Sequence, residues 1–293
     1  MGLRFSLVGP GRVGSSLALA LVRQGAICDT LVVSRNAESE LREFGNYFPS
    51  SKIVQSPSSL GRRFEVLFLT VTDDKIEDTS RELAENAGLD WKGKTVFHVS
   101  GFVKVGVLNA LKRRGAHVGA FHPVSPFATK FSPERGEGIC YDFLGDPKAL
   151  STARRLAAVL SSRLILLKSE RERQLLHLAS VIVSNFTVIG SRAAENMLAS
   201  FVDRKDIDLL IHGLLSSTLS NLTESDGGKA LTGPMARADA DVISSHLESL
   251  ENKPLLLQFY RSSSLLGIDL LLKEEHDPKR RRNLTAIKKL LEE

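Results

Sequence analysis

The sequence has few cysteines and no long apolar run, and both shortages narrow what the protein can be. Its 293 residues include only Cys28 and Cys140, which form neither a C-x-x-C pair nor a His/Cys cluster at metal-ligand spacing. We therefore expect no metal site and a reducing, cytoplasmic location. No uninterrupted apolar run approaches the ~18 residues of a membrane span, and the first strand begins too early for a signal peptide. The sequence thus predicts a protein with no membrane partner.

Positive charge is not concentrated in any face or tail. Lys and Arg number 39 against 34 Asp and Glu, a formal net charge of +5, and the positive charges are scattered. The short run Lys279–Arg282 is typical of a solvated helix face, so we expect no nucleic-acid partner. With 42% apolar and 25% charged residues the composition is that of a globular protein, and the length favours two domains.

Three glycines follow the first apolar segment at the spacing G-x-G-x-x-G. A strand over 5–8 and a helix over 15–24 flank the turn, which reads Gly9-Pro10-Gly11-Arg12-Val13-Gly14. In such a turn the first glycine permits the bend, the second lets the backbone approach a pyrophosphate, and the third lets the helix lie close to the strand. The alternative is a turn that is only structural, but the strand before it and the helix after it favour a dinucleotide site.

The end of the second predicted strand, residues 31–33, indicates which dinucleotide binds. Ser34 and Arg35 stand where an NAD site would have an acidic residue that accepts a hydrogen bond from the ribose 2′-hydroxyl. A hydroxyl and a guanidinium instead donate to a 2′-phosphate, which favours NADP(H). The alternative is that Arg35 is an ordinary exposed loop residue.

Periodicity divides the chain near residue 167. Before it, apolar segments of strand length alternate with helical patterns, and the strands are expected at residues 52–54, 64–71, 94–101, 116–121, 138–143 and 163–167. Beyond it, helix-period apolar residues continue almost to the end. We therefore predict an α/β Rossmann domain over 1–167 and an all-helical domain over 168–293.

Polar residues at the ends of these strands are candidates for the ligand edge of the sheet. Thr70, Val71, Thr72 and Asp73 should cover the middle of the dinucleotide, although Asp73 or Asp74 is more simply a helix cap. Ser100 is expected beside cofactor and substrate. His98 is more simply a structural hydrogen-bonding residue. His122 opens the proline-rich loop 122–127, whose stiffness suits one wall of a substrate pocket.

The long helix expected over 170–199 is apolar on nearly all sides, so it should be buried on several of them. His177, Ser184 and Asn185 lie within one of its faces, about two turns apart. Buried polar groups must be satisfied, so these residues either bond neighbouring helices or face a polar cleft. In the second case His177 can deliver a proton at neutral pH, as a carbonyl oxygen requires when hydride arrives.

A glycine-rich polar loop over 221–239 leads into a helix near Pro234. Lys229 and Arg237 in this stretch could hold a substrate carboxylate, or the stretch could be a plain loop between helices with solvated charges.

Four motifs together resemble the Rossmann-like proteins that carry a helical domain called DUF2520. These motifs are the G-P-G-R-V-G turn, His98-Val99-Ser100-Gly101, Ala120-Phe121-His122-Pro123 and Leu231-Thr232-Gly233-Pro234-Met235-Ala236-Arg237. That group is similar to F420-dependent NADP reductases, pyrroline-5-carboxylate reductases, 6-phosphogluconate and 3-hydroxyacid dehydrogenases, and ketopantoate reductases. The resemblance implies a 6-phosphogluconate-dehydrogenase-like fold, bound NADP(H), a cleft between the domains and a homodimer formed through the helices.

Ketopantoate reductases carry a lysine on their long helix, followed at four and eight residues by asparagines. On this sequence the lysine position falls on His177, the last asparagine on Asn185, and the middle one on Val181, which departs from the pattern. The resemblance implies His177 as proton donor and Asn185 as the residue that orients a small carbonyl or imine substrate, for example a 2-oxo acid. F420 as hydride partner, or a sensor that binds NADP(H) without chemistry, are the alternatives.

Overall fold

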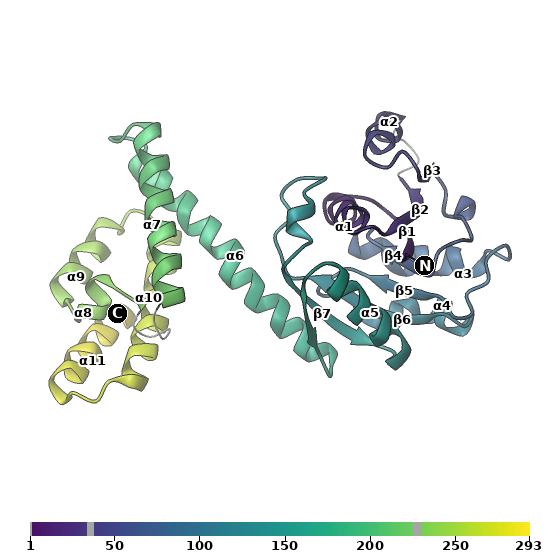
Figure 1. Ribbon diagram of the computed structural model, residues 1–293. Helices are drawn as coiled ribbons and strands as arrows, with labels where there is room; N and C mark the ends of the chain where they lie inside the picture. The colour runs from purple at the N-terminus through teal and green to yellow at the C-terminus, as the bar shows by residue number, and fades with distance from the viewer. Residues whose placement is uncertain (1, 34–37, 225–229) are drawn as a thin grey trace. The chain divides into compact units, whose positions relative to one another are not determined.

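The computed structural model describes residues 2–33, 38–224 and 230–293, so Ser34, Arg35 and Lys229 lie outside it. The chain forms two compact units, Met1–Phe186 and Thr187–Glu293, which are described separately below (Figure 1).

One sheet of eight strands organises the first unit. Its order is β3-β2-β1-β4-β5-β6-β7-β8, and the first six strands are parallel. This is the strand order of a dinucleotide-binding fold, and it confirms the predicted Rossmann domain. The six strands are β1 (Arg4–Val8), β2 (Ile27–Val32), β3 (Lys52–Val54), β4 (Val66–Leu69), β5 (Thr95–His98) and β6 (His117–Pro123).

The last two strands extend the sheet in the opposite direction. β7 (Cys140–Gly145) pairs antiparallel with β6, and β8 (Arg163–Leu166) runs parallel to β7. The reversal brings the first half of β7 beside the carboxyl end of β6, where ligands bind in such folds. A residue on β7 can therefore reach the ligand edge.

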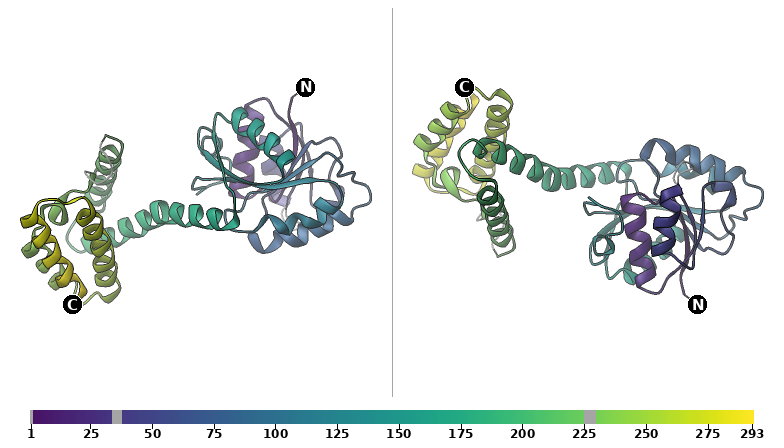
Figure 2. Two further views of the ribbon diagram at one scale, coloured as in Figure 1. Left: turned by 90° about the horizontal axis from the view of Figure 1, so that it is seen from below. Right: turned by 90° about the horizontal axis from the view of Figure 1, so that it is seen from above.

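Helices cover both faces of this sheet (Figure 2). One buried core packs sheet phenylalanines such as Phe68 and Phe97 against α1 (Arg12–Arg23), α2 (Glu38–Tyr47) and α5 (Pro147–Val159). The other packs the alternate strand residues against α3 (Ile76–Glu85), the short η3 (Val105–Leu108) and α4 (Asn109–Arg113). Because strand residues alternate between faces, both sets of apolar side chains are buried.

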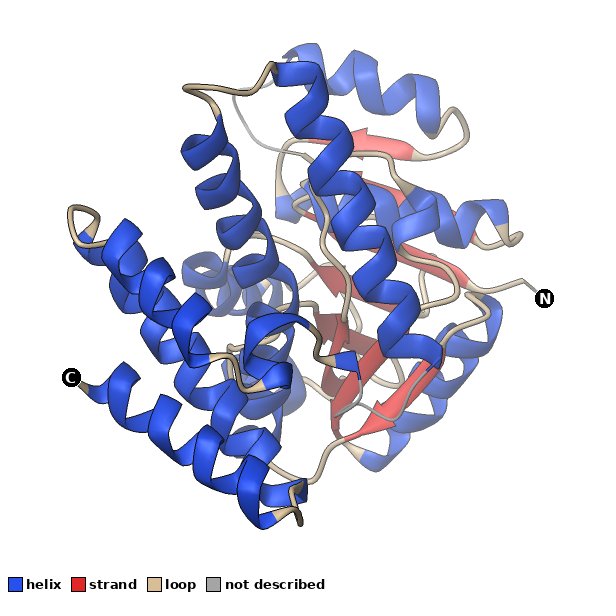
Figure 3. Cartoon of the chain, turned by 90° about the vertical axis from the view of Figure 1, so that its left-hand side faces the viewer, coloured by secondary structure: helices blue, strands red, loops and turns tan. Residues whose placement is uncertain are grey.

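The second unit is helical (Figure 3). It begins within α6 (Glu170–Leu198), and a core of apolar residues such as Ile243, Ile268 and Leu284 joins its last three long helices. Its further helices are α7 (Arg204–Glu224), α8 (Gly233–Arg237), α9 (Ala240–Ser249), α10 (Pro254–Glu274) and α11 (Pro278–Glu292). Within the described ranges no strand follows Leu166, as expected, while the boundary at 167 stays a prediction because α6 contributes to both units.

The expected burial of the long helix is wrong for the single chain. Arg173 is the buried residue of α6, whereas apolar residues such as Val183 (73% exposed) face outward. α7 is similar, with Leu209 74% exposed. By length and composition alone, α6 and α10 also pass as candidate membrane spans, although no long uninterrupted apolar run occurs in the sequence. An apolar pattern predicts that a helix face will be covered, but not by what.

Candidate functional site

The glycine-rich turn lies between β1 and α1, and two of its glycines are required by packing. Gly9 has a φ of +82°, and a Cβ there would lie 2.5 Å from Cγ1 of Val71. A Cβ on Gly14 would lie 3.0 Å from the Cβ of Thr70 and closer still to its hydroxyl. Thr70 Oγ1 donates a hydrogen bond to the carbonyl of Gly9 at 2.7 Å. The end of β4 therefore packs directly against the turn.

Gly11 has no such structural reason to be glycine. A Cβ on this residue would have no atom within 4 Å, and its φ of −68° suits any residue. Gly11 is also the N-cap of α1, where no side chain caps the helix. The first N–H groups of a helix lack intrahelical partners and attract anions. The open space above Gly11 thus fits a phosphate group that approaches the backbone.

The loop after β4 only partly matches its predicted role. Thr70 and Val71 pack against the glycine-rich turn, whereas Thr72 and Asp73 are exposed. The predicted capping by Asp73 or Asp74 is wrong: Thr72 and Lys75 occupy the cap positions and neither makes a side-chain cap. Both aspartates instead lie in the 3-10 turn η2 (Asp73–Lys75), which intervenes before α3. Arg12 is exposed at the start of α1, and Pro10 and Val13 complete the turn.

A buried histidine–aspartate pair stands at the carboxyl end of β6. The antiparallel register places His122 opposite Asp142 of β7, and Nδ1 of His122 lies 2.6 Å from Oδ2 of Asp142. The side chain of Asp142 is 1% exposed and that of His122 14%. The carboxylate accepts the Nδ1 proton, and the other ring nitrogen, Nε2, lies on the side of Gly101.

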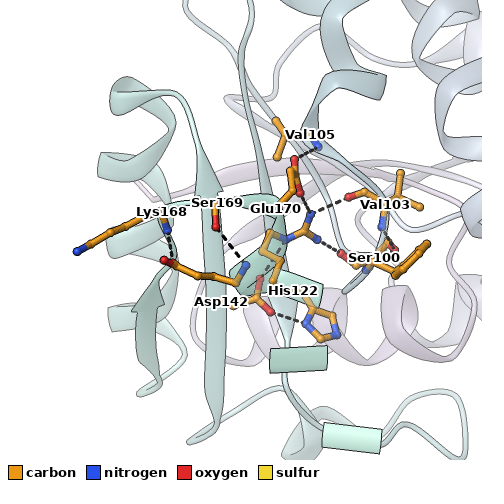
Figure 4. Close-up of polar contacts among 11 residues, drawn as sticks. Ser100, Val103, Val105, His122, Asp142, Lys168, Ser169 and Glu170 are labelled. Carbon is orange, nitrogen blue, oxygen red and sulfur yellow. Dashed lines mark hydrogen bonds and ion pairs between the residues drawn. The ribbon is translucent and has the colours of Figure 1, made fainter. Parts of the chain in front are cut away.

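Arg173, near the start of α6, fixes this pair in place. Figure 4 shows the pair, with Ser100, Val103 and Glu170 beside it. The guanidinium of Arg173 is fully buried, and Nε lies 3.5 Å from Oδ1 of Asp142. Its terminal nitrogens donate to the carbonyls of Ser100 and Val103, the latter at 2.7 Å, and form an ion pair with Glu170 at 3.0 Å. Arg173 therefore connects its own helix, α6, to strand β7 and to the loop after β5, and these contacts hold the start of α6 against the sheet.

His177 lies one turn after Arg173 and meets His122 over a glycine. Their ring centroids are 6.0 Å apart. A Cβ on the buried Gly101 would lie 2.7 Å from Nδ1 of His177 and 2.9 Å from Nε2 of His122. Both rings therefore pack closely against Gly101, where any side chain would clash with them.

The two histidines form one end of a pocket of about 570 Å³. Its walls are the loop after β6 and one face of α6, and its polar lining consists of His122, Ser125, His177, Ser180, Ser184 and Asn185. The structure thus brings His122, His177, Ser184 and Asn185 together in the first unit. Asn185 is exposed, so the argument from the cost of burying it is wrong, and its place in the pocket supports the cleft alternative.

The other predicted substrate residues lie differently. The hydroxyl of Ser100 accepts hydrogen bonds from the N–H groups of Phe102 and Val103, so it holds the loop rather than a ligand. Arg237 is exposed on α8 in the second unit, and Lys229 is outside the described residues. Their proposed role toward an acid group stays a prediction.

His98 is buried behind the pair and is not a hydrogen-bonding residue. Within the described part of the chain neither ring nitrogen has a hydrogen-bond partner. Burial, reinforced by the charge of Arg173 and by His122, lowers the pKa of His98 from 6.5 to about 3. His98 therefore stays neutral at physiological pH and is unsuited to supply a proton there.

This shift predicts a pH dependence of stability. Between pH 6.5 and 3 the unfolded chain binds a proton at His98 that the folded chain does not, so stability falls as the pH falls. Relative to a His98→Met variant, the free energy of unfolding of the parent should drop by up to about 1.4 kcal/mol per pH unit across this window. Urea unfolding followed by fluorescence of Trp91, the one tryptophan, measures it. Parallel curves for the two proteins contradict the assignment.

Two protein-family profiles match this chain. A Rossmann-like domain profile matches residues 2–123, and DUF2520, a domain of unknown function, matches residues 139–266. The chain combines a Rossmann-like domain with a DUF2520 domain. This confirms the resemblance inferred from the sequence motifs. His122 belongs to the Rossmann-like match and Asp142, Arg173 and His177 to the DUF2520 match, so the pocket joins the two matched segments.

Solved structures share the fold over nearly the whole chain. A proposed NADP oxidoreductase from Bacteroides fragilis is 22% identical over 91% of this chain and 98% of its own, with a TM-score of 0.73. A protein from Thermotoga maritima is 21% identical over 93% and 100%, with a TM-score of 0.70. Pyrroline carboxylate reductase from Plasmodium falciparum, solved with NADP bound, is 13% identical over 98% of both chains, with a TM-score of 0.60. The search of curated proteins finds no match.

Three residues of the site were not predicted from sequence. Asp142 interrupts an apolar strand, which was a usable signal because a lone charge in such a segment needs a partner. Arg173 lies within the charged run that opens the helix and gave no such signal. Gly101 carried no signal of its own, since its role depends on two histidines brought together by folding.

Proposed function

We propose that the protein is an NADP(H)-dependent oxidoreductase that transfers hydride between nicotinamide and a small carbonyl or imine compound. The observation that carries this proposal is the open space at Gly11. Packing accounts for Gly9 and Gly14, but none of the described residues accounts for a glycine at position 11. A bound pyrophosphate does, because its oxygens must approach the backbone and the N–H groups at the start of α1.

The preference for the phosphorylated dinucleotide rests on residues beyond the end of β2. Ser34 and Arg35 follow Val33 in the sequence and supply a hydroxyl and a guanidinium where NAD sites have a carboxylate. The NADP in the Plasmodium falciparum neighbour supports the same cofactor.

The pocket supports the reaction class. NADPH, when bound, supplies a hydride; the protein must place the substrate and provide a proton. His122 and His177 both line this pocket, and histidine exchanges protons at neutral pH. Ser184 and Asn185, farther along α6, supply polar atoms that orient the substrate. For a 2-oxo acid such as ketopantoate, we propose that Lys229 or Arg237 attracts the acid group.

We also propose that the protein works in the cytoplasm as a homodimer formed through its helical part, without nucleic-acid or membrane partners. The support is the set of exposed apolar side chains on α6 and α7, which a second copy would cover. Both cysteines are free, which suits a reducing compartment.

The test is oxidation of NADPH, followed at 340 nm with the purified protein and a panel of imines, aldehydes and 2-oxo acids. We expect turnover with at least one member, and NADPH preferred over NADH. Arg35→Asp should reverse that preference, because a carboxylate repels the 2′-phosphate and accepts from a 2′-hydroxyl. An unchanged affinity for NADPH in this variant contradicts the role of Arg35, and binding without turnover favours the sensor function instead.

A further inference from the structure

The two histidines of the pocket are not equivalent, because only one has a buried carboxylate behind it. Nδ1 of His122 is bonded to Asp142, whereas the described residues provide no carboxylate partner for His177. A carboxylate at Nδ1 fixes one tautomer, holds the ring still, and stabilises the doubly protonated ring. Because Asp142 holds Nδ1, Nε2 is the nitrogen with which His122 can exchange a proton with a compound in the pocket that it lines.

We infer that His122 is the residue that gives the proton to the substrate, with Asp142 and Arg173 as positioning residues and His177 as a residue that binds the substrate. This inference rests on the proposed oxidoreductase function. The resemblance to ketopantoate reductases implies His177 as the proton donor; this inference assigns the proton transfer to His122 instead.

With His122 as the proton donor, the hydride, the electron pair and the proton of the reductive step are all accounted for. The substrate carbon of the C=O or C=N bond accepts hydride, and the electron pair of that bond moves to the oxygen or nitrogen. That atom takes the proton from Nε2 of His122, which yields the alcohol or amine and leaves NADP+. His122 then regains a proton from water through the pocket mouth, while Asp142 keeps Nδ1 in place. The reverse reaction uses neutral His122 as the base.

Arg173 acts through Asp142. Its guanidinium stays charged at every accessible pH, and its bonds to the carbonyls of Ser100 and Val103 prevent it from moving away. Rotation of Asp142 away from this position would therefore break its ion pair with Nε of Arg173. The arrangement fixes the carboxylate, and through it the imidazole.

The test compares His122→Gln, His177→Gln and a matched control, His117→Gln, which alters a histidine at the other end of β6. The substrate is whichever panel compound the parent turns over. We expect His122→Gln to lower kcat at least about 100-fold with the Kd for NADPH unchanged. His177→Gln should raise KM and leave kcat within about tenfold, and His117→Gln should match the parent. Imidazole added to the medium should restore turnover to His122→Ala but not to His177→Ala.

The pH profile and the ring nitrogens give two further readouts. The groups facing His122 are Asp142 from β7, His98 from β5, and His177 and Arg173 from α6. The fall in kcat at high pH in the parent should disappear in His122→Gln and persist in His177→Gln. Nitrogen-15 spectra of the parent should show a single Nδ1–H tautomer for neutral His122, which Asp142→Asn abolishes.

The possible results separate the role of His122 from the oxidoreductase function on which it rests. Rescue of His177→Ala by imidazole instead of His122→Ala, or a kcat for His122→Gln within threefold of the parent, overturns the inference and leaves the oxidoreductase function standing. A mixed tautomer at His122 in the parent also overturns it. A parent that binds NADPH but turns over no panel compound contradicts the oxidoreductase function itself, and the inference falls with it.

Discussion

Replacement of Gly11 by alanine is expected to weaken NADPH binding about 100-fold, or about 2.7 kcal/mol, without unfolding the protein. The added methyl group projects into the open space in which the pyrophosphate is proposed to lie, and it separates the phosphate oxygens from the N–H groups at the start of α1. The backbone of Gly11 suits alanine, and no atom in the described part of the chain lies within 4 Å of the new Cβ. Isothermal titration with NADPH measures the loss.

Two other glycines serve as controls for this prediction. Gly45→Ala adds a methyl group on α2, also with no atom within 4 Å, and should leave NADPH binding as in the parent. Gly14→Ala drives a Cβ against Thr70, so it should lower stability as well as binding. If Gly11→Ala binds NADPH like the parent, the space above Gly11 is not the pyrophosphate site.

Replacement of Arg173 by methionine is expected to lower the free energy of unfolding of the first unit by about 3–5 kcal/mol. The substitution leaves Asp142 buried without its cation and removes the hydrogen bonds to the carbonyls of Ser100 and Val103. Trp91 lies in the core of the first unit, so its fluorescence during urea unfolding reports on this unit.

A double-mutant cycle separates the ion pair from simple packing. Arg173→Met combined with Asp142→Asn should cost less than the sum of the two single substitutions, because the double variant leaves no buried unpaired charge. Arg171→Met, an exposed position on the same helix, should stay within about 0.5 kcal/mol of the parent. Additive costs would show that Arg173 and Asp142 do not interact.

The sequence was sufficient for the features that depend on neighbouring residues. The turn over Gly9–Gly14 and the alternation of strands and helices follow from local spacing, and the structure confirms both. The long helix was predicted within a residue of its end at Leu198. Local periodicity determines such elements because each is formed by contacts a few residues apart.

Features that depend on distant pairing were not predicted. The antiparallel direction of β7 depends on the path of the loop before it, and only that direction places Asp142 opposite His122, 20 residues away. The exposure of Asn185 and Val183 depends on which surfaces cover α6, which an apolar pattern does not specify. The sequence therefore identified His122 and His177 as candidates but not the buried carboxylate that distinguishes them.

We propose that this chain binds NADPH at its glycine-rich turn and transfers hydride to a small compound in its pocket. The decisive measurement uses NADPH with deuterium at both C4 positions of the nicotinamide, incubated with the imine, aldehyde and 2-oxo acid panel, and mass spectrometry of the products. We expect a reduced product that carries one deuterium and an equal amount of NADP+. Tight binding of NADPH with no deuterium in any panel compound would contradict the proposal.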